Sequence, residues 1–271
     1  MVFTMTDLYS FAKKLVLCCG EQLREKRRQH NFSIQEKTGH SDIVTDHDIW
    51  AQRYLCEQIS KQYPEHSIVG EENMCREGTS CWKWVIDPID GTTNYCQFGR
   101  DYAISVALLH NGNPMYGYIL DVENGRLYES GDSPQNHAPD DEETAKEGIL
   151  HIGFKTMRDF ARQGSDPFAL AEQFRGVRYL GCASLELCGI AEEQSGLYVN
   201  SHLKLWDFAA AQAILLGRGC RIAAAALPDK SYFVCAYRTE ALYNQCLPFF
   251  PEEIRRKLNE NGGNVFHVTN M

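Results

Sequence analysis

A short acidic segment could bind a metal cation and a phosphate group side by side. Residues 87–94 read Asp-Pro-Ile-Asp-Gly-Thr-Thr-Asn and follow directly after the apolar stretch 82–86. The proline fixes its φ angle and lacks an N–H group, so Asp87 and Asp90 keep a defined relation. Gly91 lets the backbone approach a ligand closely, and N–H groups of the two threonines could form an anion-binding concavity. Polar ligands at a strand end lie on a rigid base, which is typical of a functional site.

Further carboxylates upstream favour a metal at this segment. Glu71 and Glu72 follow Gly70. Two carboxylates about 4 Å apart repel each other by about 4 kcal/mol at an effective dielectric constant of 20, so a converging cluster without a cation would be costly. Mg²⁺ takes oxygen ligands and retains waters, which suits a few carboxylates and a substrate phosphate. For an isolated Asp-Gly pair, an ordinary turn with threonine caps is the alternative interpretation.

Helical and strand-like patterns surround the acidic segment. In the first half, apolar spacing predicts helices over 8–23 and 48–62, and the polar stretch 30–41 between them is a candidate mobile loop. Apolar runs bounded by turn residues predict strands over 67–70, 82–86, 103–109 and 115–120. Asn124-Gly125 predicts a hairpin with a tight two-residue turn.

The second half follows a polar, acidic segment over 132–147. Beyond it, strand-like and helical stretches alternate, with strands predicted over 149–154, 177–180, 196–199 and 232–236 and helices over 185–193 and 208–216. We therefore predict an α+β half over residues 1–143 and an α/β half over residues 144–271.

Composition limits the class of protein. The chain has 271 residues, of which 44% are hydrophobic, enough for a large core. A formal charge of -9 disfavours nucleic acid as a partner. Eleven cysteines, an odd number at irregular spacing, predict reduced thiols. Neither a signal peptide nor a membrane-spanning stretch is predicted, so we expect a cytoplasmic protein without a membrane partner.

Three segments, in this order, resemble the signatures of the inositol monophosphatase family. They are Gly70-Glu71-Glu72, the run 84–94 and the run 205–210, and the middle one is long and highly specific. The resemblance implies a layered αβαβα sandwich in which an α+β half precedes an α/β half. It also implies a lithium-sensitive phosphomonoesterase that uses two or three Mg²⁺ ions, and a homodimer.

The resemblance further implies the metal ligands. Glu71, Asp87 and the backbone carbonyl of Ile89 would hold a first ion, and Asp87, Asp90 and Asp207 a second. Ions about 3.5 to 4 Å apart can activate an attacking water and stabilise the leaving oxygen of an in-line displacement. Hydrolysis without a covalent intermediate is therefore implied, with Glu71 counted among the catalytic residues.

The resemblance also implies which residues transfer the proton and which bind the substrate. Thr92 and Asp48 would orient and deprotonate the attacking water, although Asp48 taken alone could equally be the N-cap of the helix that follows. Lys37 would lie near metal and phosphate; without the resemblance, it would be interpreted as a solvated loop side chain. The residues implied to contact substrate are Gly91, Thr92, Thr93, Ala183, Asn200, Asp207 and Lys37.

The substrate and two rival classes stay open. Inositol-preferring members have a glutamate where this chain has Asn200, and the stretch 219–226 also departs from relatives. Inositol monophosphate, fructose 1,6-bisphosphate, 3'-phosphoadenosine nucleotides and histidinol phosphate all remain candidates. A haloacid-dehalogenase phosphatase needs two aspartates two positions apart, whereas Asp87 and Asp90 are three apart. A non-catalytic regulator that binds a sugar phosphate is the alternative from another class.

Overall fold

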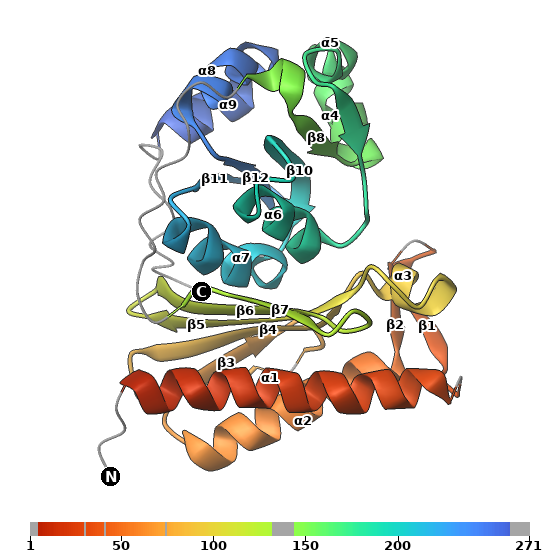
Figure 1. Ribbon diagram of the computed structural model, residues 1–271, viewed down its shortest axis with the longest axis vertical. Helices are drawn as coiled ribbons and strands as arrows, with labels where there is room; N and C mark the ends of the chain where they lie inside the picture. Colours follow the sequence, from red (N-terminus) through yellow and green to blue (C-terminus); the bar gives the residue numbers. More distant parts are fainter. Residues whose placement is uncertain (1–4, 30, 41, 74, 132–143, 261–271) are drawn as a thin grey trace.

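Layers of helices and sheets alternate through the molecule (Figure 1). The computed structural model describes residues 5–29, 31–40, 42–73, 75–131 and 144–260. In these ranges a helix layer, a sheet, a second helix layer, a second sheet and an outer helix layer follow one another. The αβαβα sandwich that the sequence resemblance implies is confirmed.

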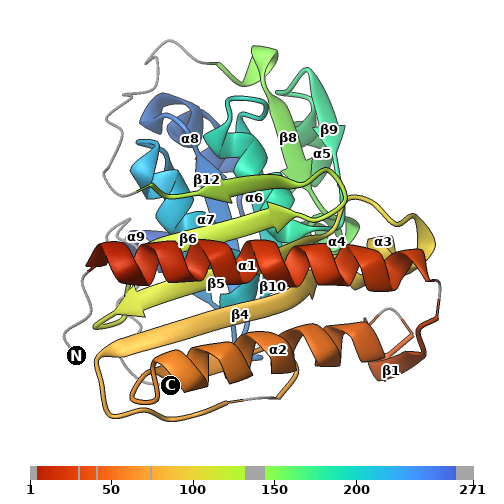
Figure 2. The same cartoon turned by 60° about the horizontal axis from the view of Figure 1, so that its bottom comes forward.

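The first helix layer consists of α1 (Met5–Arg28) and α2 (Asp46–Gln62). Both helices cover the outer face of the first sheet (Figure 2). Helix α1 buries the apolar stripe expected from its sequence, which includes Leu8, Ala12, Leu15, Val16, Cys19 and Leu23. Burying this stripe against the sheet stabilises the helix more than its intrinsic propensity does.

The first sheet carries the acidic segment. Its strands, in spatial order, are β3 (Ser67–Gly70), β4 (Trp82–Asp90), β5 (Ala103–His110), β6 (Asn113–Asp121) and β7 (Arg126–Glu129). Strand β3 runs parallel to β4, and the other neighbours are antiparallel. The hairpin predicted at Asn124-Gly125 joins β6 to β7, but its connection is longer than two residues, because the last paired residues are Asp121 and Arg126.

Part of the stretch 30–41, predicted to be a loop, is instead a β-strand. Strand β1 (Ile34–Gly39) lies within it and pairs antiparallel with β2 (Asp42–Thr45), which follows the stretch. Most side chains of β1 are exposed, so the strand has no buried apolar face and no alternating pattern that would predict it.

The second half builds the middle helices, the second sheet and the outer helices. The middle helices are α6 (Ala183–Ala191) and α7 (Leu205–Gly217), and the short α3 (Thr92–Gln97) lies at one end of the molecule. The second sheet has the order β11 (Arg221–Ala226), β12 (Tyr232–Tyr237), β10 (Leu197–Leu203), β8 (Ile149–Ile152) and β9 (Gly176–Arg178). The outer elements are α4 (Phe154–Arg162), α5 (Pro167–Ala171), α8 (Glu240–Cys246) and α9 (Glu252–Glu260), with short 3-10 turns at Ala145–Glu147 and Leu247–Phe249.

Both sheets share one apolar core with the middle helices. Val85 and Ile119 of the first sheet, Phe208 of α7, and Tyr198 and Val234 of the second sheet belong to the same buried cluster. The division predicted between residues 143 and 144 falls at the edge of a segment outside the described residues, so it stays a prediction.

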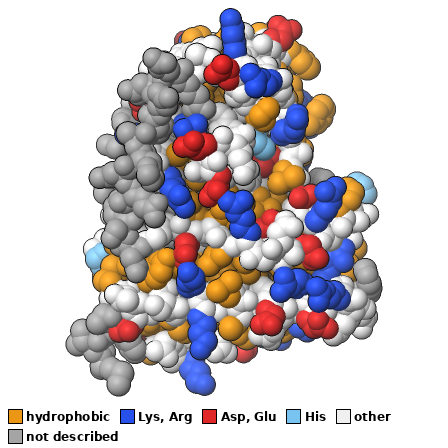
Figure 3. All heavy atoms as spheres, in the orientation of Figure 1, with side chains coloured by type: hydrophobic (Ala, Val, Ile, Leu, Met, Phe, Trp, Pro, Cys, Tyr) orange, Lys and Arg blue, Asp and Glu red, His pale blue; other side chains and the backbone are white. Residues whose placement is uncertain are grey.

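The described surface carries a mixture of charges. On the face drawn in Figure 3, acidic and basic side chains are interspersed. The eleven cysteines all fall within the described ranges and form no disulfide bond there. None of the helices in those ranges has the length and hydropathy that a membrane span requires.

Candidate active site

A bulge in β4 turns Asp87 and Asp90 toward the same side of the sheet. Asp87 pairs with Ser105 and Asp90 with Ala103, so three steps along β4 match only two along β5. Residues three apart in a regular strand point to opposite faces, and one extra residue reverses that relation. Pro88 lies in the bulge, where its missing N–H group removes no ladder hydrogen bond. Both carboxylates therefore face the middle helix layer.

Neighbouring elements bring two more carboxylates to this place. Strand β3 runs parallel to β4 and ends at Gly70, opposite Ile86. The next residue, Glu71, donates its N–H group to the carbonyl of Ile86 at 3.1 Å, which places it beside Asp87. Asp207 lies in the first turn of α7, which packs against β4, β5 and β6. Four carboxylates from β3–β4 and α7 thus face one another across the sheet–helix boundary.

Burial and mutual repulsion perturb these carboxyl groups. Burial raises the pKa of Asp87 well above its usual range, and the charges of Glu71, Asp90 and Asp207 raise it further. Burial, followed by the charge of Asp90, likewise raises the pKa of Asp207. Burial raises the pKa of Asp90 to about 6, against opposing hydrogen bonds from the start of α6. The cluster is unfavourable in its fully ionised form, and a bound cation would relieve it.

Backbone N–H groups donate hydrogen bonds to two of these carboxylates. Asp90 accepts from the N–H groups of Ala183 at 3.2 Å and Ser184 at 2.6 Å. Asp207 accepts from the N–H group of Lys204 at 2.7 Å. Within the part of the chain that the structure describes, no three acidic, histidine or cysteine side chains are arranged to enclose a metal ion.

The donor set nevertheless fits Mg²⁺. Carboxylate and carbonyl oxygens are its preferred protein ligands, and it usually keeps several waters, so it needs no closed protein cage. The pKa values of Asp87, Asp90 and Asp207 are all raised, so a positive charge among these three carboxylates would be favourable.

Thr92 and Asp48 are joined by a hydrogen bond. The Thr92 hydroxyl lies 3.1 Å from Asp48 Oδ1 and 3.1 Å from the carbonyl oxygen of Ile89. Asp48 is fully buried, and burial raises its pKa to about 7, against hydrogen bonds from Thr45. The alternative interpretation of Asp48 as an N-cap is wrong: Thr45 caps α2, and Asp48 completes the capping box three residues later.

Lys37 lies at the rim of the carboxylate cluster. Its ammonium group is 2.8 Å from Glu71 Oε1 and 2.5 Å from Glu72 Oε1. Partial burial opposes the charge, but the two carboxylates together raise the pKa of Lys37 above its usual value. Lys37 therefore lies beside Glu71, one of the expected metal ligands, although it belongs to strand β1 and not to a loop.

The backbone groups predicted to meet substrate differ in their surroundings. Gly91 has φ +87, and a Cβ atom there would lie 3.1 Å from the carbonyl oxygen of Asp101, so only glycine fits. It turns the chain into α3, whose first residues are Thr92 and Thr93. The N–H group of Ala183, by contrast, is already bonded to Asp90.

Asn200 is turned toward other side chains of the second half. Its Oδ1 accepts from the Thr156 hydroxyl at 2.8 Å, and its Nδ2 donates to the Tyr198 hydroxyl at 3.2 Å. The charges of Asp90 and Asp207 contribute to the raised pKa of Tyr198, after burial and the charge of Glu186. The Asn200 side chain is therefore held by Thr156 and Tyr198, and among the described residues no hydrogen bond joins it to the carboxylates.

Comparison with known proteins identifies the family of the chain. The model of the inositol monophosphatase family matches residues 4–245. The chain belongs to the inositol monophosphatase family. Inositol-1-monophosphatase of Bacillus subtilis is 31% identical over 222 residues, which cover 78% of this chain and 82% of the relative. Nus factor SuhB of Xylella fastidiosa is 28% identical, covering 73% of this chain and 74% of the relative.

A solved structure extends the likeness to the fold. Inositol monophosphatase II from Staphylococcus aureus superposes with a TM-score of 0.75 at 22% identity, covering 93% of this chain and 96% of that one. This likeness supports the layered fold of the family. Substrate and metal are not carried over by it.

The sequence did not predict several contacts that hold the candidate site together. The thiol of Cys182 lies 3.4 Å from Asp90 Oδ2, and Ser184 donates its N–H group to the same oxygen. Thr45 fixes Asp48, as the Thr-x-x-Asp spacing could have indicated. The other contacts join residues about 90 positions apart, for which local spacing carries no signal.

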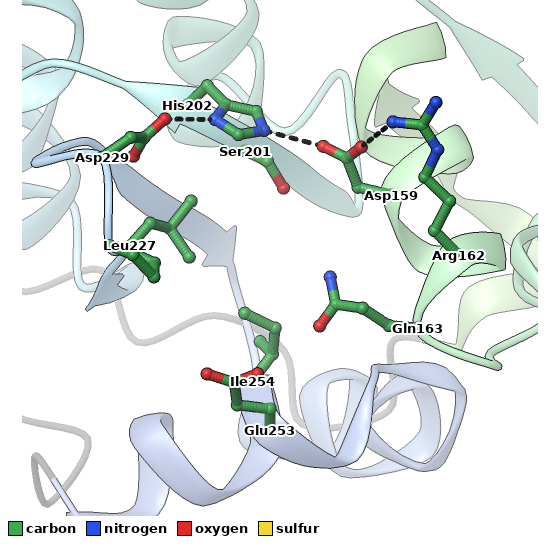
Figure 4. Close-up of a pocket in the computed structure, with 10 residues that line it drawn as sticks. Asp159, Arg162, Gln163, Ser201, His202, Leu227, Asp229, Glu253 and Ile254 are labelled. Carbon is green, nitrogen blue, oxygen red and sulfur yellow. Dashed lines mark hydrogen bonds and ion pairs between the residues drawn. The ribbon is translucent and has the colours of Figure 1, made fainter.

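A separate pocket of about 390 Å³ lies on the outer side of the second sheet. In Figure 4, His202 bridges Asp159 of α4 and Asp229 of the β11–β12 connection. Its ring nitrogens lie 2.7 Å from Asp159 Oδ2 and 2.8 Å from Asp229 Oδ2. The lining contains none of the residues predicted for the family site, so the pocket is distinct from the carboxylate cluster.

Proposed function

We propose that the chain is a cytoplasmic, Mg²⁺-dependent phosphomonoesterase that hydrolyses a small phosphorylated metabolite. The observation that carries this proposal is the group of Glu71, Asp87, Asp90 and Asp207, with raised pKa values at the three aspartates. Such a cluster favours a bound cation. Family membership independently favours phosphate-ester chemistry.

Two or three Mg²⁺ ions are proposed to bind this cluster. Glu71, Asp87 and the Ile89 carbonyl would hold one, and Asp87, Asp90 and Asp207 another. When bound, the ions supply activation of the attacking water and charge stabilisation at the leaving oxygen. The sequence resemblance also leads us to propose inhibition by lithium.

Thr92 and Asp48 are proposed to move the proton. Thr92 Oγ1 would accept a proton from the attacking water while its own proton passes to Asp48 Oδ1, 3.1 Å away. A carboxylate with a pKa of about 7 suits a base that works near neutral pH. The buried Thr45 cap keeps this carboxylate in place.

The phosphate is proposed to lie between α3 and Lys37. The backbone at Gly91, Thr92 and Thr93 would face its oxygens, and the ammonium group of Lys37 would orient it by charge. Ala183, Asn200 and Asp207 are proposed to contact the remainder of the substrate. For Ala183, this requires its N–H group to be shared with or released from Asp90.

Phosphate release tests the proposal and ranks substrates. The purified protein would be assayed with and without Mg²⁺ on inositol monophosphates, fructose 1,6-bisphosphate, 3'-phosphoadenosine nucleotides and histidinol phosphate. Mg²⁺-dependent turnover of one class is expected. Turnover that is equally fast with a chelator present would contradict the metal assignment.

A non-catalytic regulator is the second candidate. It is favoured by relatives named Nus factor SuhB, which match most of this chain. A folded protein that binds a sugar phosphate in the same assay conditions but releases no phosphate from any of them would favour the regulator over the enzyme.

Substitution at Asn200 should change substrate preference. Asn200→Glu places a carboxylate where inositol-preferring members have one, and a charge-assisted hydrogen bond to a substrate hydroxyl is stronger than a neutral one. We expect kcat/KM for inositol monophosphates, relative to the other phosphates, to rise about 10-fold. Asn200→Gln is the control, since glutamine has the same length as glutamate but carries no charge. An unchanged ranking in Asn200→Glu would remove Asn200 from the substrate contacts.

A homodimer is proposed through the edge of the second sheet. Strand β9 ends the described strand order, and large apolar side chains near it are exposed, including Phe154 at 73% and Tyr179 at 60%. Such surfaces often mark interfaces. We expect light scattering to give a dimer, and Tyr179→Glu to weaken it by about 30-fold or more. A wild-type monomer at high protein concentration would contradict the proposal.

A further inference from the structure

A second hydrogen bond joins the same two helices as the bond between Asp48 and Thr92. His47 Nδ1 and the Tyr95 hydroxyl form a short hydrogen bond, and both residues are buried. His47 precedes Asp48 in α2, and Tyr95 follows Thr92 by three positions in α3. Residues three apart lie on one face of a helix, so the two bonds link the same two helix starts.

Helix α3 depends on its neighbours for its position. It has six residues and lies beside β2 at one end of the molecule (Figure 1). A helix this short is not stable by itself in water. The direction of the Thr92 hydroxyl therefore depends on the contacts that hold α3, which include those to α2 and the hydrogen bonds from the Asn94 side chain to the carbonyls of Asp101 and Leu180.

We propose that His47 and Tyr95 are a positioning pair for the reaction. Their bond fixes the first turn of α3 against the start of α2, so that the Thr92 hydroxyl stays within reach of Asp48. This inference rests on the proposed phosphatase function. It adds two residues that would set the geometry of the proton transfer without taking part in it.

Packing alone would retain the Tyr95 ring. It lies 5.4 Å from the ring of Phe32 and 4.9 Å from that of Tyr102, measured between centroids. Arg27 Nε donates to the Tyr95 carbonyl at 2.8 Å. Removing only the hydroxyl should therefore leave the fold in place while releasing the bond to His47.

Tyr95→Phe is the direct test, with kcat and KM measured in Mg²⁺ on the best substrate of the phosphate panel. A small misplacement of a reacting group can cost up to about 100-fold in rate. We expect kcat to fall about 10-fold and KM to change less than about twofold, because proton transfer is affected and substrate binding is not. Tyr118→Phe is the matched control: Tyr118 is also buried, and its hydroxyl donates to the Tyr9 carbonyl at 3.0 Å. Tyr118→Phe should lower the melting temperature about as much as Tyr95→Phe does, but it should keep the wild-type kcat.

A double-substitution cycle separates positioning from general destabilisation. If Tyr95 acts through Thr92, adding Tyr95→Phe to Thr92→Val should lower kcat no further. A loss that simply adds to that of Thr92→Val would overturn the positioning role. Should Tyr95→Phe fold poorly, His47→Phe breaks the same bond from the other side and should give the same loss of kcat.

The outcomes distinguish this inference from the function on which it rests. Wild-type kcat in both Tyr95→Phe and His47→Phe, with Thr92→Val slow, would overturn the positioning pair and leave the phosphatase intact. A wild-type protein that releases no phosphate would overturn both. A 10-fold lower kcat in Tyr95→Phe and unchanged kcat in Tyr118→Phe would support the pair.

Discussion

Replacing Asp87 by asparagine should lower Mg²⁺-dependent phosphate release by more than about 100-fold and, in the metal-free protein, raise the melting temperature. Loss of a hydrogen-bond partner of a metal ligand typically costs about 10- to 100-fold, and loss of the ligand should cost more. Burial and the charges of Glu71, Asp90 and Asp207 raise the pKa of Asp87, so its charged form is unfavourable without a cation. Enzyme assays and thermal unfolding in a chelator at pH 8 measure the two effects.

Asp121→Asn is a suitable control for that experiment. Asp121 is also largely buried, but it accepts from the N–H group of Asn124 at 3.2 Å and from its side chain at 2.7 Å. Asp121→Asn would remove a hydrogen-bond acceptor without relieving any repulsion between carboxylates. Phosphate release should therefore stay at the wild-type level, and the melting temperature should not rise. An active Asp87→Asn enzyme, or one that is less stable than wild type without metal, would contradict the role of the cluster.

Mg²⁺ should stabilise the protein much more at pH 8 than at pH 5. The pKa values of Asp90 and Asp48 in the folded protein are about 6 and about 7, above an unfolded value of about 4. The folded state then binds more protons than the unfolded state in this range, so stability without metal falls as pH rises from about 4 through 7. A cation that binds only the folded state at 100 times its Kd contributes about 2.7 kcal/mol, which corresponds to about 5 to 10 °C for a chain of this size.

Thermal unfolding at both pH values, with Mg²⁺ or with sodium chloride of equal ionic strength, measures this difference. Sodium should have little effect, because screening acts weakly on buried charges. In Asp87→Asn, the Mg²⁺ shift should largely disappear. Equal shifts at pH 5 and pH 8 in the wild type would mean that the ion binds somewhere other than these carboxylates.

The sequence predicts the backbone of the acidic segment better than its surroundings. The segment from Asp87 to Thr93 carries its own backbone constraints in a proline and a glycine, and the β4 bulge with Gly91 at φ +87 follows from them. Pairing of β3 with β4 then places Glu71 beside Asp87. The proline and glycine indicate the backbone of this segment, whereas the place of Glu71 beside Asp87 is implied by the family resemblance and not by spacing alone.

Other features depend on partners far along the chain. Strand β1 is polar and exposed, so nothing in residues 34–39 predicts it without its partner β2. The orientation of Asn200 depends on Thr156 of α4 and on the irregular pairing after Asn200 in β10. The bond between His47 and Tyr95 spans 48 positions. Tertiary packing determines these three features, and no periodicity in the sequence indicates them.

Diffraction from crystals grown with Mn²⁺ and phosphate would test the central claim most directly, because anomalous scattering locates the ion independently of the protein model. We predict at least one anomalous peak coordinated by Asp87, with Glu71, or with Asp90 and Asp207, and phosphate beside it near Thr92. Phosphate bound there without any metal peak, or a metal peak only at a place remote from Asp87, would contradict the assignment of this cluster as the metal centre.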